Sequence, residues 1–586
     1  MNKNQKISQS FAKGALIMAL GMLFVKIMGA VFKVPLAYII GGEGMGYFNG
    51  AYSLYNPIYA VATAGLPIAV SRMVSGDIAR KRFKDVRKIH KISVPIFFCT
   101  GMAGFILMIL GTFLYVKMAK APGSVYSILM LAPTVLFSCL ISIYKGYYEG
   151  LRNMIPTAVS EVIESVCKVI FGLVFALAVV KYGVHEYNIQ GTVFGNHYDS
   201  LSLARSATLP FASAGAVLGI TFGSVAGYLY MLITYKIQGD GIKEEELENS
   251  PAPRRAKTII KLLFSVSTLV ALGAIVMNFA GVLDATLTQR RIYDIMQTAP
   301  DTLISAYNGL IPTDVIERGT THIFFLGGFG YMSTITMVLP AIVQGISISA
   351  LPAVTAAWVT GARETLKKNI ESILKMTAMI SIPSGLGLSV LSYPIMDLVY
   401  NTVGGHRQPG EICIGAHVMS VSAVAVIFLC ISTPICSMLQ AVGRADLPVK
   451  ILTVGMIIKV VLNYILVGIP SINIQGASFG TLVCYLFVFI AAFYCLYKES
   501  GISLDLKSIF FKPLIAGVFC ACFSYFSHNL LSKIAPYKLS TVISIIIGCA
   551  IYIIFILILR TITRSDLKIL PKSEKIIYFL EKHKLM

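Results

Sequence analysis

The chain has 586 residues, of which 56% are hydrophobic and 13% charged, and its formal net charge is +21. Apolar runs of roughly 18 or more residues recur from end to end, and each is long enough for a transmembrane helix. This pattern excludes a soluble globular protein. The short alternating segments typical of a membrane β-barrel are not seen in the sequence, so the fold class that we predict is an all-α integral membrane protein.

The cysteines and the excess of basic residues exclude further classes. The eleven cysteines lie mostly inside apolar runs and have no metal-ligand spacing, so we expect no disulfide, no metal site and no cofactor. Most lysines and arginines fall in alternate loops, which is the positive-inside pattern rather than a nucleic-acid-binding surface. The charge pattern therefore predicts a multi-pass membrane protein with both termini in the cytoplasm, in contact with the bilayer and with no nucleic acid.

The first half of the chain, residues 1–235, is predicted to contain six spans. The first apolar run is too long for a signal-peptide core, so we expect it to be retained as a helix. The six spans are expected at about 11–38, 47–74, 92–116, 124–148, 155–180 and 206–235. A charged linker with two prolines, residues 236–257, follows and is expected to be mobile.

The second half, residues 258–498, is predicted to contain six more spans, and residues 499–560 two further ones. They are expected at about 258–286, 322–358, 372–398, 412–440, 449–468, 475–497, 509–530 and 539–559. The run at 322–358 is long for one crossing, so we expect its ends to project or tilt. The total is about fourteen spans, followed by a basic cytoplasmic tail, residues 561–586.

Two local patterns recur in both halves, in the same order. One is a Leu-Pro pair with a glycine nine residues after the proline and then a basic loop, and the other is an Arg-x-x-x-Pro turn. The pairs are Leu66-Pro67 with Leu351-Pro352, and Arg152/Pro156 with Arg444/Pro448. We therefore predict two six-helix lobes in parallel, pseudo-twofold repeat, with two C-terminal helices appended. In transporters built this way the substrate site lies where the repeats meet.

Several charged residues fall inside the predicted spans. Such residues are energetically expensive and normally face a bundle interior or a water-filled cavity. We predict that five of them bind an anionic substrate: Lys26, Lys33, Arg72, Lys168 and Lys459. A structural role is the alternative for each, because lysines can be neutralised by partners or can snorkel, and Arg72 can anchor the membrane interface.

Four further charged residues could couple transport to a cation or could form internal pairs: Glu164, Asp284, Arg290 and Arg291. Glu164 precedes Lys168 by one helical turn, in the favourable order for an internal pair. Asp284 is the acid deep in the seventh span, and it could instead pair with either arginine. Glu161 is expected to pair with Arg152. We identify no nucleophile–base set, nucleotide loop or paired-carboxylate motif, so we do not expect an enzyme.

The segments after the second and fourth spans, GLPIAVSRMVSGDIARKRF (65–83) and GYYEGLRNMIPTAVSEVIES (146–165), resemble the multidrug/oligosaccharidyl-lipid/polysaccharide (MOP) flippase superfamily. Within it, the chain is similar to the polysaccharide-export and stage V sporulation protein B group, related to the lipid II flippases. The resemblance implies a monomer in a bacterial cell membrane with a V-shaped central cavity. It also implies a flippase that moves an undecaprenyl-(pyro)phosphate-linked oligosaccharide from the inner to the outer leaflet by alternating access.

Two other functions remain open from the sequence. A cation-coupled multidrug antiporter of the same fold would need acids in its central cavity, where the first span offers lysines. A membrane enzyme acting on lipid-linked sugars would need an acid or histidine set at a loop mouth. The outer loop at 289–321 and the start of the next span contain such residues: Asp294, Asp301, Asp314 and His322. The lysines of the first span favour a flippase over the drug pump, and the repeat pattern argues against the enzyme.

Overall fold

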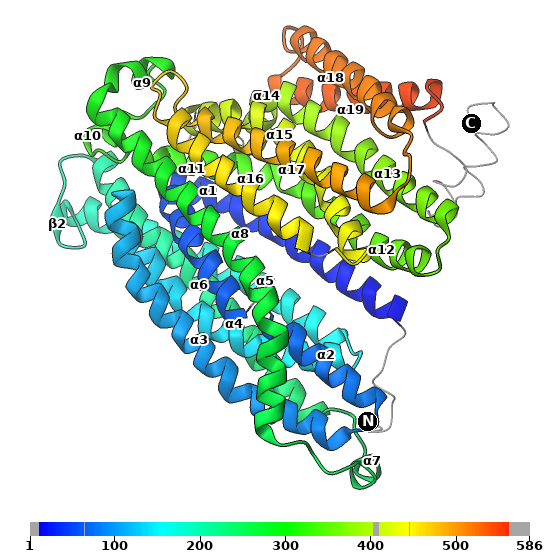
Figure 1. Ribbon diagram of the computed structural model, residues 1–586. Coiled ribbons are helices and arrows are strands. Elements are labelled where there is room, and N and C mark those ends of the chain that lie inside the picture. The colour runs from blue at the N-terminus through cyan, green and yellow to red at the C-terminus, as the bar shows by residue number, and fades with distance from the viewer. Residues whose placement is uncertain (1–10, 64, 402–408, 445, 562–586) are drawn as a thin grey trace. The chain divides into compact units, whose positions relative to one another are not determined.

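The computed structural model of the chain describes residues 11–63, 65–401, 409–444 and 446–561. In these ranges the regular secondary structure is helical apart from one short hairpin, which confirms the predicted all-helical class (Figure 1). It divides into two compact units. The N-terminal unit comprises Met1–Tyr293 and Ile311–Gly327, and the C-terminal unit comprises Asp294–Leu310 and Gly328–Met586.

The N-terminal unit is a bundle of long helices with a hairpin at one end and a short helix at the other (Figure 1). Its elements are α1 (Phe11–Thr63), α2 (Leu66–Ala79), α3 (Phe83–Ala119), α4 (Ser124–Gly150), α5 (Ile155–Gln190), β1 (Thr192–Val193), β2 (Asn196–His197), α6 (Leu201–Gln238), α7 (Glu244–Glu248), most of α8 (Ala256–Thr298), α10 (Thr313–Glu317) and the start of α11 (Thr321–Thr336).

The regular secondary structure in the described part of the C-terminal unit is all helical. It contains the end of α8, α9 (Pro300–Ala306), the rest of α11, α12 (Val338–Val359), α13 (Arg363–Val390), α14 (Ser392–Tyr400), α15 (Pro409–Ala441), α16 (Asp446–Val467), α17 (Gln475–Ser500), the π-helical turn η1 (Lys507–Phe511), α18 (Lys512–Leu531) and α19 (Tyr537–Ile558).

Twelve helical stretches among the described residues are long and apolar enough to cross a membrane, so the chain is a multi-pass membrane protein. One of these stretches is Phe24–Ala79, whose 56 residues far exceed a single crossing. The predicted long span at 322–358 is wrong as one helix. The helical run is interrupted at Met337, where α11 ends and α12 begins.

Gly41 turns α1 back on itself. Its φ of 63° lies in the left-handed region that glycine adopts without strain, and it interrupts the helical backbone there. The rings of Phe32 and Phe48 lie 5.9 Å apart, although 16 residues of straight helix would separate them by about 24 Å. The first and second predicted spans are therefore the two arms of α1, and their facing sides meet inside the N-terminal unit.

Glycines allow α5 and α6 to pack with their backbones in contact. A Cβ added at Gly219 would lie 2.2 Å from the backbone nitrogen of Gly172, and one at Gly223 would lie 2.6 Å from the carbonyl oxygen of Glu164. Small residues at helix crossings are the usual means of close approach in membranes. This packing fixes the position of α5, which carries Glu164 and Lys168 in its first half.

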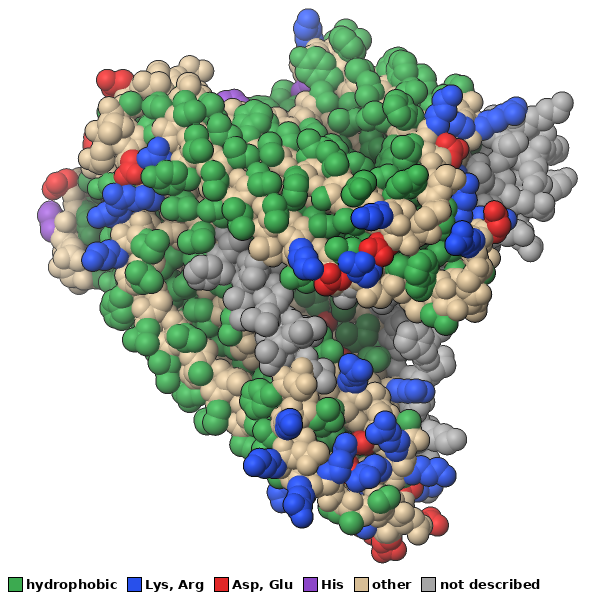
Figure 2. Space-filling view, in the orientation of Figure 1, with side chains coloured by type: hydrophobic (Ala, Val, Ile, Leu, Met, Phe, Trp, Pro, Cys, Tyr) green, Lys and Arg blue, Asp and Glu red, His purple; other side chains and the backbone are tan. Residues whose placement is uncertain are grey.

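The linker at 236–257 is folded against the N-terminal unit, so the predicted mobile linker is wrong. Arg254 pairs with Asp77 and also lies 3.3 Å from Asp85, and Arg87 binds Asp240 at 2.7 Å. All three aspartates are buried, and buried carboxylates require such partners. Lysines and arginines gather at this end of the unit, around α7 (Figure 2). The charge of the linker therefore serves internal pairing, which its composition alone does not reveal.

Candidate functional site

Charged and aromatic side chains from α1, α4 and α5 come together inside the N-terminal unit. We call this set the α1–α5 column; its members are Lys26, Phe32, Lys33, Tyr52, Lys145, Glu161, Glu164 and Lys168. Lys168 on α5 is at its centre. Its Nζ atom lies 5.1 Å from the ring centroid of Phe32 and 5.7 Å from that of Tyr52. These are cation–π distances. Within the described part of the chain Lys168 makes no ion pair, so its charge rests on aromatic faces rather than on a carboxylate.

Two further lysines extend the positive end of the column. Lys33 is half-buried on α1 and is repelled by the charges of Lys168 and Lys26. Lys26 lies two turns earlier on the same helix and is exposed. Three like charges held together in an apolar surrounding cost free energy unless an anion accompanies them. The arrangement is therefore chemically suited to a phosphate or pyrophosphate group.

Carboxylates form the other end of the column. Lys145 on α4 pairs with Glu161 on α5 at 3.2 Å, so the predicted pairing of Glu161 with Arg152 is wrong. The negative charge of Glu164 attracts the positive charges of both Lys145 and Lys168. The predicted internal pair of Glu164 with Lys168 therefore takes the form of an attraction without an ion-pair contact among the described residues.

The structure places the other predicted site residues individually. Arg72 is exposed on α2, and no described interaction joins it to the column. Asp284, Arg290 and Arg291 are half-buried on α8, where the Arg290 guanidinium lies 5.7 Å from the ring centroid of Tyr293. Lys459 is half-buried on α16 in the C-terminal unit. The structure thus brings Lys26, Lys33, Glu164 and Lys168 together and leaves the roles of the others as predictions.

Sequence reasoning missed Lys145 and the tyrosines of α1. Lys145 stands at the end of an apolar run, where a snorkelling lysine is common, so its residue type carried no signal. Tyr52, Tyr55 and Tyr59 follow one another at helical spacing, a pattern that is usual for a packed helix face. The contact of Tyr52 with Lys168 depends on the turn at Gly41, which the sequence shows only as one glycine among many.

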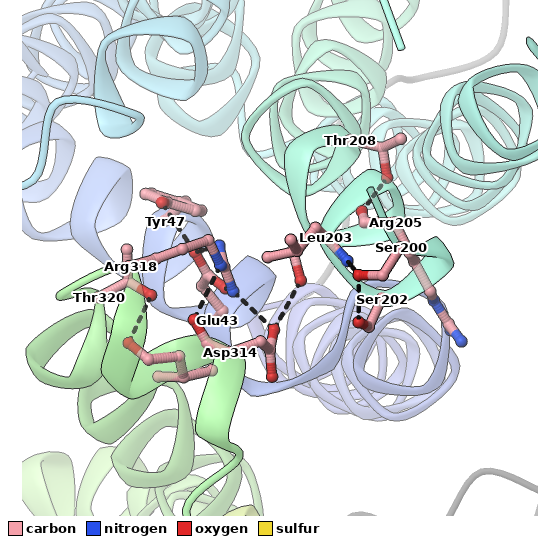
Figure 3. Close-up of polar contacts among 12 residues, drawn as sticks. Glu43, Tyr47, Ser200, Ser202, Leu203, Arg205, Thr208, Asp314, Arg318 and Thr320 are labelled. Atoms are coloured by element: carbon pink, nitrogen blue, oxygen red, sulfur yellow. Dashed lines mark hydrogen bonds and ion pairs between the residues drawn. The ribbon is translucent and has the colours of Figure 1, made fainter. Parts of the chain in front are cut away.

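A second polar cluster lies beside the turn at Gly41 in α1, within the N-terminal unit. Arg318 donates to both carboxylate oxygens of Glu43, at 2.9 and 2.6 Å, and to Asp314 at 3.0 Å. The Tyr47 hydroxyl donates to Glu43, and Ser206 donates to Asp314. Figure 3 shows Arg318 between the two acids. Burial alone would lower the pKa of Arg318, but the bonds to Glu43 and Asp314 outweigh it and the pKa is raised.

This cluster bears on the possibility of an enzyme in the outer loop. Asp314 is engaged by Arg318 and Ser206, and a ring nitrogen of His322 lies 3.0 Å from the carbonyl oxygen of Lys120. Two of the four candidate residues, Asp314 and His322, are therefore held by structural contacts. A general acid or base needs a position facing its substrate, and these contacts argue for a role in packing.

Comparison with known families divides the chain in two. The family described as polysaccharide biosynthesis protein matches residues 11–191, and the family described as lipid II flippase MurJ matches residues 323–558. The first match contains the whole α1–α5 column, and the second contains Lys459.

Individual relatives cover nearly the whole chain. The lipid II flippase MurJ of Bacillus subtilis is 22% identical over 506 residues, which is 85% of this chain and 84% of the relative. Stage V sporulation protein B of the same organism is 23% identical over 573 residues, 96% and 98% of the two chains.

Solved structures with the same fold are also known. A structure of the lipid II flippase MurJ in an inward closed conformation aligns with a TM-score of 0.63 at 15% identity, over 93% of this chain and 98% of that one. A multidrug resistance MATE family transporter of the MOP superfamily, in an inward-facing conformation, aligns with a TM-score of 0.59 at 14% identity, over 82% and 98%. At these identities the likeness establishes the fold and not the substrate.

Proposed function

This chain belongs to the MOP superfamily of membrane transporters, related to the lipid II flippases, and from that premise we propose that it is a flippase for a lipid-linked anionic glycan. The passenger would be an oligosaccharide on undecaprenyl phosphate or pyrophosphate. It would move from the inner to the outer leaflet by alternating access, as the parallel six-helix repeat and the cytoplasmic termini predicted from the sequence require.

The observation that carries the proposal is the group of three lysines in the α1–α5 column. Lys33 is repelled by both Lys26 and Lys168, and Lys168 has cation–π contacts in place of an ion pair among the described residues. Bound phosphate would relieve that repulsion with charge-assisted hydrogen bonds, each worth roughly 1.5–3 kcal/mol. A pump for cationic drugs would gain nothing from this group, because it would repel the drug.

The charge of the head group also supplies a driving force. An inside-negative membrane potential favours outward movement of a negative charge by about 2.3 kcal/mol per 100 mV. Neutralisation by Lys33 and Lys168 lowers the cost of taking the phosphate through the apolar region. Lys459 in the C-terminal unit, Arg72 on α2, and Asp284, Arg290 and Arg291 on α8 remain candidate contributors to binding or coupling.

The test is transport of undecaprenyl pyrophosphate carrying a neutral disaccharide, in proteoliposomes that contain the purified full-length chain. We expect the parent protein to move the lipid across the bilayer chemically unchanged, and Lys33→Gln and Lys168→Gln to reduce the rate roughly tenfold or more. Lys117→Gln, which changes an exposed lysine on α3, is the matched control and should transport normally. Undiminished transport by the Lys33→Gln, Lys168→Gln double variant would contradict the proposal, and a covalently altered product would identify an enzyme.

A further inference from the structure

The second arm of α1 presents one face that begins at Tyr52, beside Lys168, and continues beyond the proposed phosphate site. Asn49, Tyr52, Asn56 and Tyr59 recur at intervals of three and four residues, so they lie on one side of the helix. Asn56 is exposed, and Asn49, Tyr52 and Tyr59 are half-buried. From Tyr52 to Tyr59 the face extends about 10 Å along the helix, which is long enough for a short oligosaccharide.

Stacked rings stiffen this face. The rings of Tyr55 and Tyr59 are stacked with centroids 5.3 Å apart, and Tyr52 meets Tyr55 edge-on at 5.8 Å. Tyr55 itself is buried and supports its two neighbours. Tyr52 also contacts Lys168 and Phe48, so the half-buried ring of Tyr59 offers the larger surface for contact. Aromatic faces carry partial negative charge and favour the C–H-rich faces of sugar rings, while the hydroxyl tips can bond to sugar hydroxyls.

Hydrogen-bonding groups flank the rings. Among the hydrogen bonds of the described residues, none involves the side-chain amide of Asn56 or the hydroxyl of Tyr52. Glu164 lies close enough to Tyr52 and Tyr59 to interact with both electrostatically, and Lys145 lies close to Tyr59. Carboxylate, amide and ammonium groups together offer both acceptors and donors to a polyhydroxylated ligand.

The charges of the column also orient such a ligand. Lys26, Lys33 and Lys168 lie toward the first arm of α1, while Glu161 and Glu164 lie on the first turns of α5 beside Lys145. Phosphate is attracted to the lysines and repelled by the carboxylates. A neutral glycan joined to that phosphate is left opposite the tyrosines.

We propose that Tyr52, Asn56 and Tyr59 of α1, with Glu164 of α5, form a glycan subsite that binds the neutral sugars of the lipid-linked substrate next to its phosphate. The inference rests on the proposed function, because it assumes that Lys33 and Lys168 hold the phosphate. It adds a source of selectivity that the lysines cannot provide, since every lipid of this class carries phosphate.

The test compares two lipids on the purified full-length protein: undecaprenyl pyrophosphate, and undecaprenyl pyrophosphate carrying a neutral disaccharide. We expect the disaccharide lipid to bind more tightly. Tyr59→Leu should weaken its binding roughly tenfold and Asn56→Ala roughly fivefold, by loss of ring contact and of a hydrogen bond. Binding of the sugar-free lipid should change less than twofold. Tyr59→Phe keeps the ring and should lose much less affinity than Tyr59→Leu.

The outcomes separate this inference from the proposed function. Equal binding of the two lipids by the parent protein, or equal losses for both lipids in Tyr59→Leu and Asn56→Ala, would overturn the glycan subsite. Unchanged binding of both lipids to Lys33→Gln and Lys168→Gln would overturn the phosphate site instead. If Tyr59→Leu fails to fold, Asn56→Ala decides, because this exposed side chain makes no hydrogen bond to the described residues.

Discussion

In the N-terminal unit the hydroxyl of Ser127 on α4 donates to Ser213 on α6, and in the C-terminal unit Ser422 on α15 donates to Ser478 on α17; both distances are 2.9 Å. In each unit a third helix, α5 or α16, packs on the same partner through glycine. A Cβ at Gly480 on α17 would lie 3.3 Å from the carbonyl oxygen of Lys459. On α6 the corresponding glycine is Gly223, which lies against the backbone of Glu164 and Lys168. Both units therefore place a lysine helix against a glycine-containing neighbour.

The side chains around that lysine differ between the two units. On the N-terminal side α1 contributes Lys26 and Lys33, and α5 itself contributes Glu161 and Glu164. On the C-terminal side α16 carries Lys459 and, one turn later, Asn463, with no acid between them. The helix packing is therefore shared by the two units, whereas the described charged side chains around Lys168 and Lys459 differ.

The largest expected effect tests the shared packing. Gly219→Leu would force a side chain into the backbone of α5, and Gly480→Leu would force one onto the side chain of Asn463. Because backbone cannot give way as a side chain can, Gly219→Leu should cost about 3 kcal/mol or more and abolish folded protein, and Gly480→Leu should cost about 1–3 kcal/mol. The yield of monodisperse protein in detergent measures this. Gly76→Ala and Gly387→Ala, at helical glycines with open space around them, should leave the yield unchanged.

The next effect distinguishes the ends of the two units. Arg254→Ala leaves the buried Asp77 without its ion-pair partner and leaves Asp85 with Arg82 alone, which should cost about 3 kcal/mol. Arg444 pairs with Glu499 and Asp446 on an exposed surface, where ion pairs contribute little, so Arg444→Ala should cost much less stability than Arg254→Ala. Thermal unfolding of the two variants in the same detergent compares them, and equal losses would show that the buried position of the linker pairs is unimportant.

A third prediction concerns the lysines themselves. Lys168→Gln should slow transport of the lipid-linked disaccharide roughly tenfold or more, because it removes a group that we propose binds phosphate. Lys459→Gln should slow it less, since Lys459 does not belong to the group of three lysines in the N-terminal unit. Initial rates in proteoliposomes provide the measurement. A larger effect at Lys459 would move the principal phosphate site to the C-terminal unit.

The smallest effect concerns the serine pairs. Ser127→Ala and Ser422→Ala each remove one hydrogen bond between buried hydroxyls, so each should cost about 1 kcal/mol. Thermal midpoints should fall by similar amounts and transport rates should stay normal. Unequal losses would show that the two helix crossings are not energetically equivalent.

The sequence predicts the membrane helices well, because apolar length is sufficient evidence for a span. It does not predict where they break. Leu66-Pro67 begins a separate helix after Gly65, whose φ is 94°, whereas α12 continues through Leu351-Pro352. The matching turns also differ: the left-handed residue is Arg152 in one and Gly443 in the other. The short sequence motifs are therefore more similar between the two halves than the backbone conformations at those motifs.

The candidate site is predictable only in part. A lysine inside an apolar span is visible in the sequence, and three of the five predicted cations lie together in the structure. Their neighbours are not visible, because Phe32 and Tyr52 reach Lys168 through the turn at Gly41. The pairing of Lys145 with Glu161 likewise depends on the angle between α4 and α5, which composition does not determine.

Binding of undecaprenyl pyrophosphate and of undecaprenol, the same lipid without phosphate, most directly tests whether the lysines of the N-terminal unit hold an anion. The full-length parent protein should bind the pyrophosphate lipid at least roughly tenfold more tightly than the alcohol. The Lys33→Gln, Lys168→Gln double variant should lose that preference while still binding undecaprenol. A double variant that keeps the full preference would contradict the account.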